Sequence, residues 1–282
     1  MGGVAVVTDS TADLPSALVE SIGLRVVPLS VTFGDTSLIA GVTLSRESFY
    51  ARLTETDRIP TTSQPAPVWF EEAYADCVDD GKDAIVSIHC SSALSGTVGL
   101  ARDRGARMPI PVEVIDSRLV GGALGLAALA AHRVAEDGGS VAAVVAAAER
   151  VRRTARSLIV VDSLDHLKRG GRVTGTQAAL GTAMRVKPLL HLTAEGRVEV
   201  LERTRTWSRA LDRVTELAVE AAAGASVDMV VVHAVAPDRA DELTERLSAR
   251  LDVRERHHTL IGPIVGTHVG PGAVGVAVVP TR

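Results

Sequence analysis

Short runs of apolar residues alternate with helix-forming segments through the first half of the chain. The runs at residues 4–7, 83–89 and 112–115 are bounded by polar residues, which predicts buried strands. Segments of helical character lie between and after them, at residues 15–22, 45–53, 68–78, 97–107, 119–135 and 141–153. Strands that alternate with helices in this way predict a mostly parallel sheet with crossover helices.

Three further segments of this half are less regular. Residues 24–33 read as a strand interrupted by Pro28, which indicates an edge strand or a bent one. Residues 34–41 are predicted to form a loop. Residues 59–67 contain three prolines, so we expect an extended segment whose hydroxyls are displayed rather than used in a strand ladder.

The second half has a different pattern. Two short apolar runs around the turn at residues 194–197 predict a β-hairpin. The predicted elements are strands at 158–161, 189–192, 198–201 and 229–233 and helices at 208–223 and 237–250. We therefore predict an α/β protein of two domains: residues 1–157 with a mostly parallel sheet, and residues 158–282 with a mixed sheet.

The composition disfavours several classes of function. With 30 Lys and Arg against 34 Asp and Glu, the chain has no basic excess for binding nucleic acid. Cys77 and Cys90 are the only cysteines and have no metal-ligand spacing, so neither a disulfide framework nor a zinc site is expected. The first residues lack the features of a signal peptide, and the longest apolar stretch, residues 120–131, is too short to span a bilayer. These features predict a cytoplasmic protein without metal.

The sequence SSALSGT, at residues 91–97, connects a predicted strand to a predicted helix. In an open α/β sheet, ligands collect at such turns. The hydroxyls of Ser92, Ser95 and Thr97 and the free N–H groups of a helix start suit a carboxylate or a phosphate. Gly96 allows a ligand to approach the backbone closely. The alternative is that one of these hydroxyls only caps the helix.

Two other segments display polar groups. Thr62 and Ser63 lie in the proline-rich segment, for which the alternative is an ordinary loop. Residues 261–275 are predicted to form a glycine-rich loop that contains His268 and matches the G-x-G-x-x-G pattern. We reject dinucleotide binding because the pattern runs into a strand-like segment instead of opening a helix. His268, among residues with little side chain, is either structural or faces a ligand.

Five short motifs together resemble the DegV family. They are TDSTAD (8–13), TSQP (62–65), LSGT (94–97), KRGGR (168–172) and THVGPG (267–272), and they occur in the family's order and spacing over nearly the whole chain. The family is similar to bacterial fatty-acid-binding proteins, including the binding subunits of the fatty acid kinase system. The resemblance implies a two-domain α/β protein that holds one long-chain fatty acid in an apolar tunnel between the domains.

The resemblance also implies the residues that bind the fatty acid's carboxylate, namely Thr62, Ser95 and His268. Ser92, three residues before Ser95 on the same turn, remains an alternative to it. All these groups are hydrogen-bond donors without a permanent charge, and a carboxylate only accepts. The neighbouring ligand-binding candidates are Ser63, Gly96 and Thr97.

On this basis the chain is expected to be a carrier without turnover of its own, and to need no cofactor besides the bound fatty acid. It would present the fatty acid to a fatty acid kinase and meet the membrane only peripherally, for lipid exchange. The alternative is a serine hydrolase in which Ser95 and His268 are oriented by Asp9 or Asp116. Against it, the sequence around Ser95 is not a G-x-S-x-G elbow. A kinase activity of the chain itself is disfavoured because no GxxxxGK[ST] motif is present.

Four arginines are candidates for the surface that docks the kinase, the alternative being ordinary solvated charge. They are Arg169, Arg172, Arg203 and Arg205. One departure from the family pattern is Thr61, which stands where a Lys is common and changes the charge expected near the carboxylate.

Overall fold

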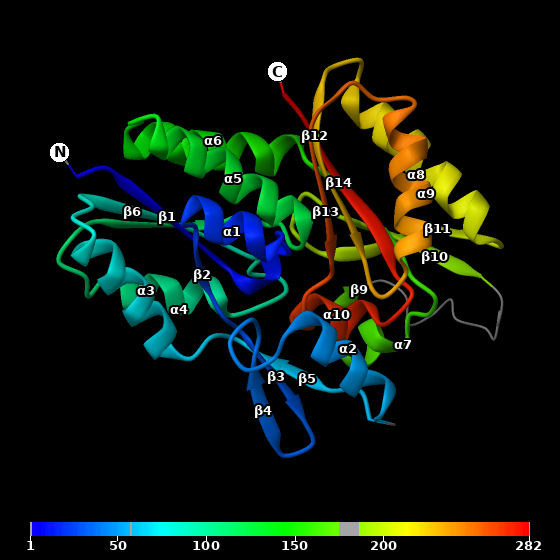
Figure 1. The fold of residues 1–282 in the computed structure, drawn as a ribbon, viewed down its shortest axis with the longest axis horizontal. Helices are drawn as coiled ribbons and strands as arrows, with labels where there is room; N and C mark the ends of the chain where they lie inside the picture. Colours follow the sequence, from blue (N-terminus) through cyan, green and yellow to red (C-terminus); the bar gives the residue numbers. More distant parts are fainter. Residues whose placement is uncertain (1, 57, 175–185, 282) are drawn as a thin grey trace.

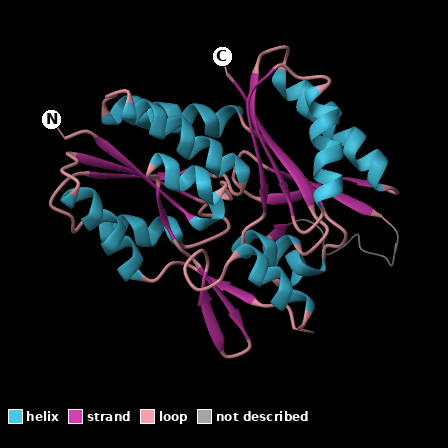
Figure 2. Cartoon of the chain, in the orientation of Figure 1, coloured by secondary structure: helices cyan, strands magenta, loops and turns pink. Residues whose placement is uncertain are grey.

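The computed structural model describes residues 2–56, 58–174 and 186–281, in which two large sheets lie side by side above a small third sheet (Figure 1). Helices flank both large sheets, as the colouring by secondary structure shows (Figure 2). The predicted α/β fold, with a parallel N-terminal sheet and a mixed C-terminal sheet, is confirmed.

The N-terminal sheet is parallel throughout and has the order β2-β1-β6-β7. Its strands are β1 (Val4–Asp9), β2 (Arg25–Val27), β6 (Ala84–His89) and β7 (Val112–Asp116). Every residue of the two central strands, β1 and β6, is buried, as expected for a parallel sheet covered on both faces. The carboxyl ends of all four strands meet at one edge of this sheet.

The C-terminal sheet is mixed and has the order β13-β12-β14-β8-β10-β11-β9. Its strands are β8 (Arg156–Val160), β9 (Val173–Thr174), β10 (Lys187–Leu192), β11 (Val198–Thr204), β12 (Val227–His233), β13 (Val253–Leu260) and β14 (Val274–Pro280). The predicted hairpin is present as the antiparallel pair β10 and β11. Edge strand β13 was not predicted, because its alternation of Arg, Glu and His carries no apolar period.

The helices pack against the outer and inner faces of these sheets. They are α1 (Ser16–Ile22), α2 (Arg46–Thr54), α3 (Pro67–Asp79), α4 (Thr97–Gly105), α5 (Gly122–Glu136), α6 (Val141–Thr154), α7 (Asp165–Arg169), α8 (Trp207–Ala222), α9 (Pro237–Ser248) and α10 (Pro263–Val269). In Figure 1, α3 and α4 cover one face of the N-terminal sheet, whereas α8 and α9 cover the outer face of the C-terminal sheet. Helix α5 contacts β1 on one side and β12 and β14 on the other, so it joins the two large sheets.

The expected domain division at residue 157 stays a prediction. The first strand of the C-terminal sheet, β8, begins at Arg156, close to that boundary. However, one continuous apolar cluster includes Val86 of β6, Leu124 of α5 and Val230 of β12. The two sheets are therefore packed together through a shared core.

The small sheet corrects two predictions. The predicted interruption of strand 24–33 at Pro28 and its edge position are confirmed by β2, at the edge of the N-terminal sheet, but the residues after Pro28 form a separate strand, β3 (Ser30–Phe33), in the small sheet. The predicted loop 34–41 is wrong, because β4 (Thr36–Ile39) pairs with β3 in an antiparallel hairpin. A two-residue turn makes this hairpin, and Gly34 adopts the positive φ of 57° that its first position requires.

The proline-rich segment also takes part in this sheet. Residues Thr61–Ser63 form β5, which pairs with β3, so their backbone is used in a ladder and that part of the prediction is wrong. The side chains remain displayed, with Thr62 half-buried and Ser63 exposed.

The glycine-rich segment corrects a further prediction, because His268 lies on helix α10 and not in a loop. Pro263 occupies the first turn of this helix, where its missing N–H has no cost, and Gly270 ends it with φ 73°. The rejection of dinucleotide binding stands, since the glycine pattern runs directly into β14.

None of the described helices is long and apolar enough to cross a bilayer. Cys77 and Cys90 are free thiols, and both are buried.

Two helical glycines give a matched test of how tightly α5 packs on the N-terminal sheet. A Cβ on Gly125 would lie 2.6 Å from the Ala12 carbonyl oxygen and 2.7 Å from the Leu14 side chain, whereas a Cβ on Gly99 of α4 meets nothing within 4 Å. We expect G125A to lower the free energy of unfolding by about 1–3 kcal/mol. G99A should leave it unchanged or raise it by up to about 1 kcal/mol. Denaturant unfolding of both variants measures the difference, and equal effects would contradict the packing described.

Candidate ligand-binding site

A cavity lies between the carboxyl ends of the N-terminal strands and the inner face of the C-terminal sheet. Most of its lining is apolar, and the C-terminal sheet contributes Ile159, Leu190, Leu192, Val198, Val232 and Ala277. Polar side chains from separate elements also line it, including Thr62, Ser63, Gln64, Ser95, Arg172 and His268. The cavity therefore combines an aliphatic wall with a set of hydrogen-bonding groups.

Sheet topology explains why the 91–97 turn reaches this cavity. The crossover from β1 leads to β2 on one side, and the crossover from β6 leads to β7 on the other. The strand order thus reverses between β1 and β6, and the crevice outside such a point is where open α/β sheets bind ligands. Ser95 follows β6 at this crevice and lines the cavity.

The Ser95 hydroxyl is held by its own turn. Its oxygen lies 2.8 Å from Thr97 Oγ1 and accepts a long hydrogen bond of 3.4 Å from the Thr97 N–H. The residue at the N-cap of α4 is Gly96, which has no side chain to cap the helix. When the Thr97 hydroxyl donates to Ser95, the Ser95 proton is free for a ligand.

Thr62 and His268 are 206 positions apart in the sequence but adjacent in the structure. The His268 Nε2 atom lies 2.9 Å from Thr62 Oγ1. The other ring nitrogen, Nδ1, is buried and has no hydrogen-bond partner within the described part of the chain. It lies against Gly170, where a Cβ would be only 2.2 Å away. The ring therefore fills a space that any side chain at position 170 would occupy.

The imidazole of His268 is neutral at pH 7. Burial, the positive charge of Arg172 and the neighbouring His166 together lower its pKa to about 4, burial contributing most. A neutral ring carries one N–H and one acceptor nitrogen. Protonated on Nε2, it donates to Thr62 and leaves the Thr62 hydroxyl proton for a ligand.

Arg172 adds a permanent charge to the cavity beside the uncharged groups expected there. It was assigned to a partner surface, but it is half-buried and lines the cavity. Its Nε donates to the Leu94 carbonyl oxygen at 3.3 Å, and Nη1 donates to the carbonyl oxygen of Gly170. These bonds connect the motif KRGGR to the turn that carries Ser95.

Other predicted residues lie outside the cavity lining. Ser92 is exposed, and its hydroxyl donates to Asp116 Oδ2 at 2.5 Å. Thr97 is buried beneath Ser95. Gly96 faces Gln64, whose Oε1 would lie 2.3 Å from a Cβ at that position, so the glycine leaves room for Gln64 rather than directly for a ligand. Gln64 was not singled out from the sequence, although the TSQP motif contains it.

The three remaining candidate arginines, Arg169, Arg203 and Arg205, are exposed. Arg169 lines a separate surface cleft together with Arg58 and His166. The Nδ1 atom of His166 lies 3.0 Å from the carbonyl oxygen of Thr267, the residue before His268. This cleft is thus adjacent to the helix that carries the cavity's imidazole.

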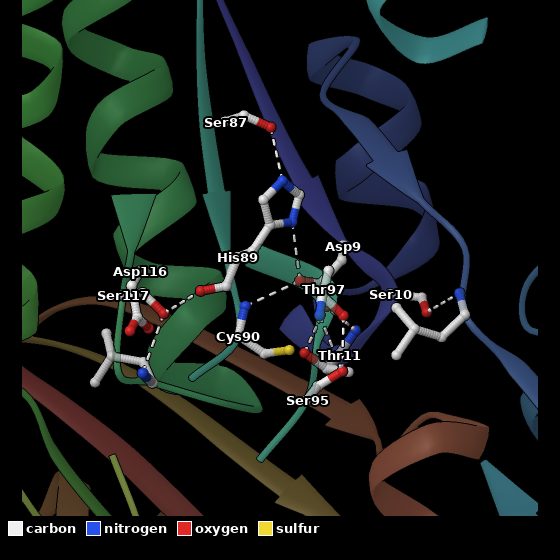
Figure 3. A network of polar contacts seen from close by, with 12 residues as sticks. Asp9, Ser10, Thr11, Ser87, His89, Cys90, Ser95, Thr97, Asp116 and Ser117 are labelled. Atoms are coloured by element: carbon white, nitrogen blue, oxygen red, sulfur yellow. Dashed lines mark hydrogen bonds and ion pairs between the residues drawn. The ribbon is translucent and has the colours of Figure 1, made fainter. Parts of the chain in front are cut away.

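The orienting carboxylates of the hydrolase alternative are engaged elsewhere. Asp9 Oδ2 lies 3.1 Å from His89 Nδ1, and His89 Nε2 lies 2.6 Å from Ser87 Oγ (Figure 3). This Ser-His-Asp arrangement is fully buried, and Ser87 continues to the Tyr74 hydroxyl at 2.8 Å. Ser95 and His268 share a cavity, but neither Asp9 nor Asp116 pairs with His268.

Burial alone would raise the pKa of Asp9, but hydrogen bonds and the nearby imidazole of His89 more than offset this and hold it below its ordinary value. The carboxylate accepts from the Thr11 N–H and hydroxyl and from the Cys90 N–H. Asp9 is thereby a structural anion that fixes the ends of β1 and β6. Among residues 2–56, 58–174 and 186–281, no three His, Cys, Asp or Glu side chains lie together as a metal site.

The neutral state of His268 predicts a pH dependence of stability. Between the ordinary histidine pKa of 6.5 and the folded value of about 4, only the unfolded chain binds the proton, so stability falls as the pH is lowered through this window. Between pH 7 and 4 we expect the free energy of unfolding of the wild type to fall by on the order of 3 kcal/mol more than that of H268Q, which lacks the titrating ring. Unfolding of both proteins from pH 7 to 4 measures it. An NMR titration of His268 with its midpoint near 6.5 would contradict the assignment.

Three comparisons with known proteins bear on this site. The sequence profile of the DegV family, described as uncharacterised proteins, matches residues 3–281. A DegV domain-containing protein of Streptomyces coelicolor is 44% identical over 276 residues, which cover 98% of each chain.

Two solved structures of DegV proteins are similar over the whole chain. One, from Thermus thermophilus and described by its fatty acid binding, has a TM-score of 0.91 at 34% identity and covers 99% of both chains. The other, DegV of Bacillus subtilis, described as a fatty acid binding protein, has a TM-score of 0.89 at 33% identity and covers 100% of both chains. The motifs, the fold and these similarities agree, and the chain belongs to the DegV family.

Proposed function

We propose that this protein binds one long-chain fatty acid in the cavity, with the carboxylate at Thr62, Ser95 and His268. The observation that carries the proposal is the composition of the cavity, in which these three polar side chains lie beside a wall that is mostly aliphatic. The fatty acid binding of the Thermus and Bacillus relatives supports the same ligand class.

The two hydroxyl donors suit a carboxylate, and His268 orients one of them. Thr62 and Ser95 each have a hydroxyl proton available when His268 and Thr97 donate to them. Neutral His268 supplies no charge, so the half-buried guanidinium of Arg172 is the positive charge that compensates the ligand's anion. Ser63 and Gln64 are exposed and line the same cavity, which places its opening beside these donors.

The aliphatic wall supplies the affinity. Burying an alkyl chain stabilises the complex by roughly 0.8 kcal/mol for each methylene, before the cost of ordering the chain. The polar groups then set which end of the ligand lies at the opening. In this arrangement the protein is a carrier, and its two large sheets, expected as the domains 1–157 and 158–282, form the walls.

We further propose that the carrier presents the carboxylate to a fatty acid kinase in the cytoplasm, with peripheral membrane contact for lipid exchange. The cleft lined by Arg58, His166 and Arg169 supports a docking role because it adjoins the helix of His268. Arg203, near the end of β11, and Arg205, directly after it, are exposed and belong to the proposed docking surface.

Binding is tested by removing single hydroxyls. We expect S95A and T62A each to weaken fatty acid affinity by about 1–3 kcal/mol, because the carboxylate loses one donor. S92A is the matched control, since Ser92 is on the same turn but outside the cavity lining. Native mass spectrometry after incubation with oleate or palmitate gives the stoichiometry, and competition with a fluorescent fatty acid gives the affinities. Unchanged affinity in both S95A and T62A would show that the carboxylate lies elsewhere.

The hydrolase alternative is tested with the same proteins. Short p-nitrophenyl esters should give no sustained release of nitrophenol with the wild type. Release that persists over many turnovers and is lost in S95A would favour the hydrolase instead of the carrier.

Kinase docking is tested by reversing one exposed charge. We expect R205E to reduce acyl-phosphate formation by a fatty acid kinase at low salt, where electrostatic attraction is least screened, while fatty acid binding is retained. R153E, on the exposed side of α6, is the control for a general effect of charge. Equal acyl-phosphate formation by R205E and wild type counts against Arg205 in the docking surface.

A further inference from the structure

A buried carboxyl group lines the cavity and is not used by the carboxylate-binding groups. Asp13 is 2% exposed and is the only Asp or Glu among the described residues of the cavity lining. Its Oδ1 accepts a hydrogen bond of 2.8 Å from the Gly262 N–H. Its Oδ2 is buried and has no hydrogen-bond partner within the described part of the chain. Buried polar atoms of native proteins nearly always have a partner, so this oxygen needs an explanation.

The two oxygens of Asp13 face different spaces. A Cβ on Gly262 would lie 2.7 Å from Oδ1, and Gly262 lines a separate cleft on the outer side of Asp13. A Cβ on Gly121 would lie 3.8 Å from Oδ2, and Gly121 lines the fatty acid cavity but not that cleft. The unpartnered oxygen is therefore the one on the cavity side.

Asp13 is also held firmly in place. Its backbone has φ 48°, in the left-handed region that Asp and Asn tolerate best among residues with a side chain. The charged groups around it are Arg46 and Asp9, with the Tyr50 hydroxyl nearby. Burial raises the pKa of Asp13 to about 6, partly offset by Arg46 and by the Gly262 N–H. At neutral pH the group is mostly ionised, and Oδ2 is a strong acceptor.

The acceptor does not belong to the carboxylate end of the ligand, because two carboxylates repel each other and neither can donate. The neighbouring contacts place it further along the cavity. The Cys90 thiol contacts the hydroxyls of Ser95 and Thr11, which surround it in Figure 3. The Thr11 carbonyl oxygen accepts from the Gly121 N–H, beside Asp13. The path from Ser95 through Cys90 and Thr11 thus leads to Asp13, which faces the ligand's chain.

We infer that Asp13 Oδ2 is a second binding position in the cavity, which accepts a hydrogen bond from a hydroxyl group on the acyl chain. This inference rests on the proposed fatty acid function and names its ligand class, a monohydroxylated long-chain fatty acid. The hydroxyl at the matching carbon donates to Oδ2, whereas an unsubstituted chain leaves the oxygen without a partner. Only a narrow range of hydroxyl positions satisfies this geometry, because the carboxylate fixes the register of the chain.

The test compares stearate with a positional series of monohydroxystearates by competition with a fluorescent fatty acid. For the wild type, we expect one isomer, or two adjacent ones, to bind at least about tenfold more tightly than stearate, since a hydrogen bond to a charged acceptor is worth more than a neutral one. Isomers with the hydroxyl elsewhere should bind more weakly than stearate, because they bury an unpaired polar group.

Two variants assign the preference to Asp13. D13A should bring the ratio between the best isomer and stearate to about one. D13N tests the same point if D13A does not fold, because Asn keeps an acceptor for the Gly262 N–H and tolerates the left-handed backbone. Its neutral amide should lower the ratio between the best isomer and stearate at least about threefold. D116N, a carboxylate change at the same sheet edge outside the cavity, is the control and should keep the wild-type ratio.

Equal binding of stearate and every isomer by the wild type would overturn the inference while leaving the fatty acid function intact. So would a preference that survives unchanged in folded D13A or, failing that, in D13N. Absence of binding for stearate and all isomers alike would overturn the fatty acid function and this inference with it.

Discussion

The ligand site depends on the hydrogen bonds that the buried carboxylate of Asp9 accepts. This carboxylate lies at the end of β1 and accepts hydrogen bonds from the Thr11 N–H and hydroxyl, from the Cys90 N–H and from His89. A charge without solvent is stable only when its lone pairs are satisfied in this way. The bonds to Thr11 and Cys90 fix the chain directions after β1 and β6, so the turn that carries Ser95 begins from a rigid edge.

Arg46 and Asp13 position helix α10, which carries His268. Arg46 of α2 donates to the Leu14 carbonyl oxygen and to the Leu260 carbonyl oxygen, which connects the segment after β1 with the end of β13. Asp13 accepts from the Gly262 N–H at the start of α10. Together these contacts hold α10 against the N-terminal half, with His268 facing Thr62. The site thus depends on polar contacts of helix α2 and of the segment after β1, as well as on the apolar packing of the two large sheets.

The strands and helices with a strong apolar period could be predicted from the sequence. The resemblance of the motifs to the DegV family predicted that Thr62, Ser95 and His268 share one site. The sequence did not predict β4 or β13, because both strands are largely solvent-accessible and are held by pairing with a neighbour, which leaves no apolar pattern in the sequence. Helix α10 was hidden by its glycines and proline, because their local preference does not reveal that Asp13 accepts a hydrogen bond from the N-cap residue Gly262. Arg172 was assigned to the surface because charge alone does not distinguish an exposed guanidinium from one that lines a cavity.

The topology of the C-terminal sheet has a consequence for how the protein is made. Strand β14 is inserted between β12 and β8, and it follows α10 in the chain. During synthesis, the sheet that forms the cavity wall lacks a central strand until β14 has left the ribosome. Thr62 and Ser95 emerge long before their partner His268. Until β14 has emerged, the nascent chain accordingly has no complete cavity, and the edges of β12 and β8 with which β14 pairs remain open. Chaperones are therefore expected to protect these unpaired strand edges until β14 has emerged.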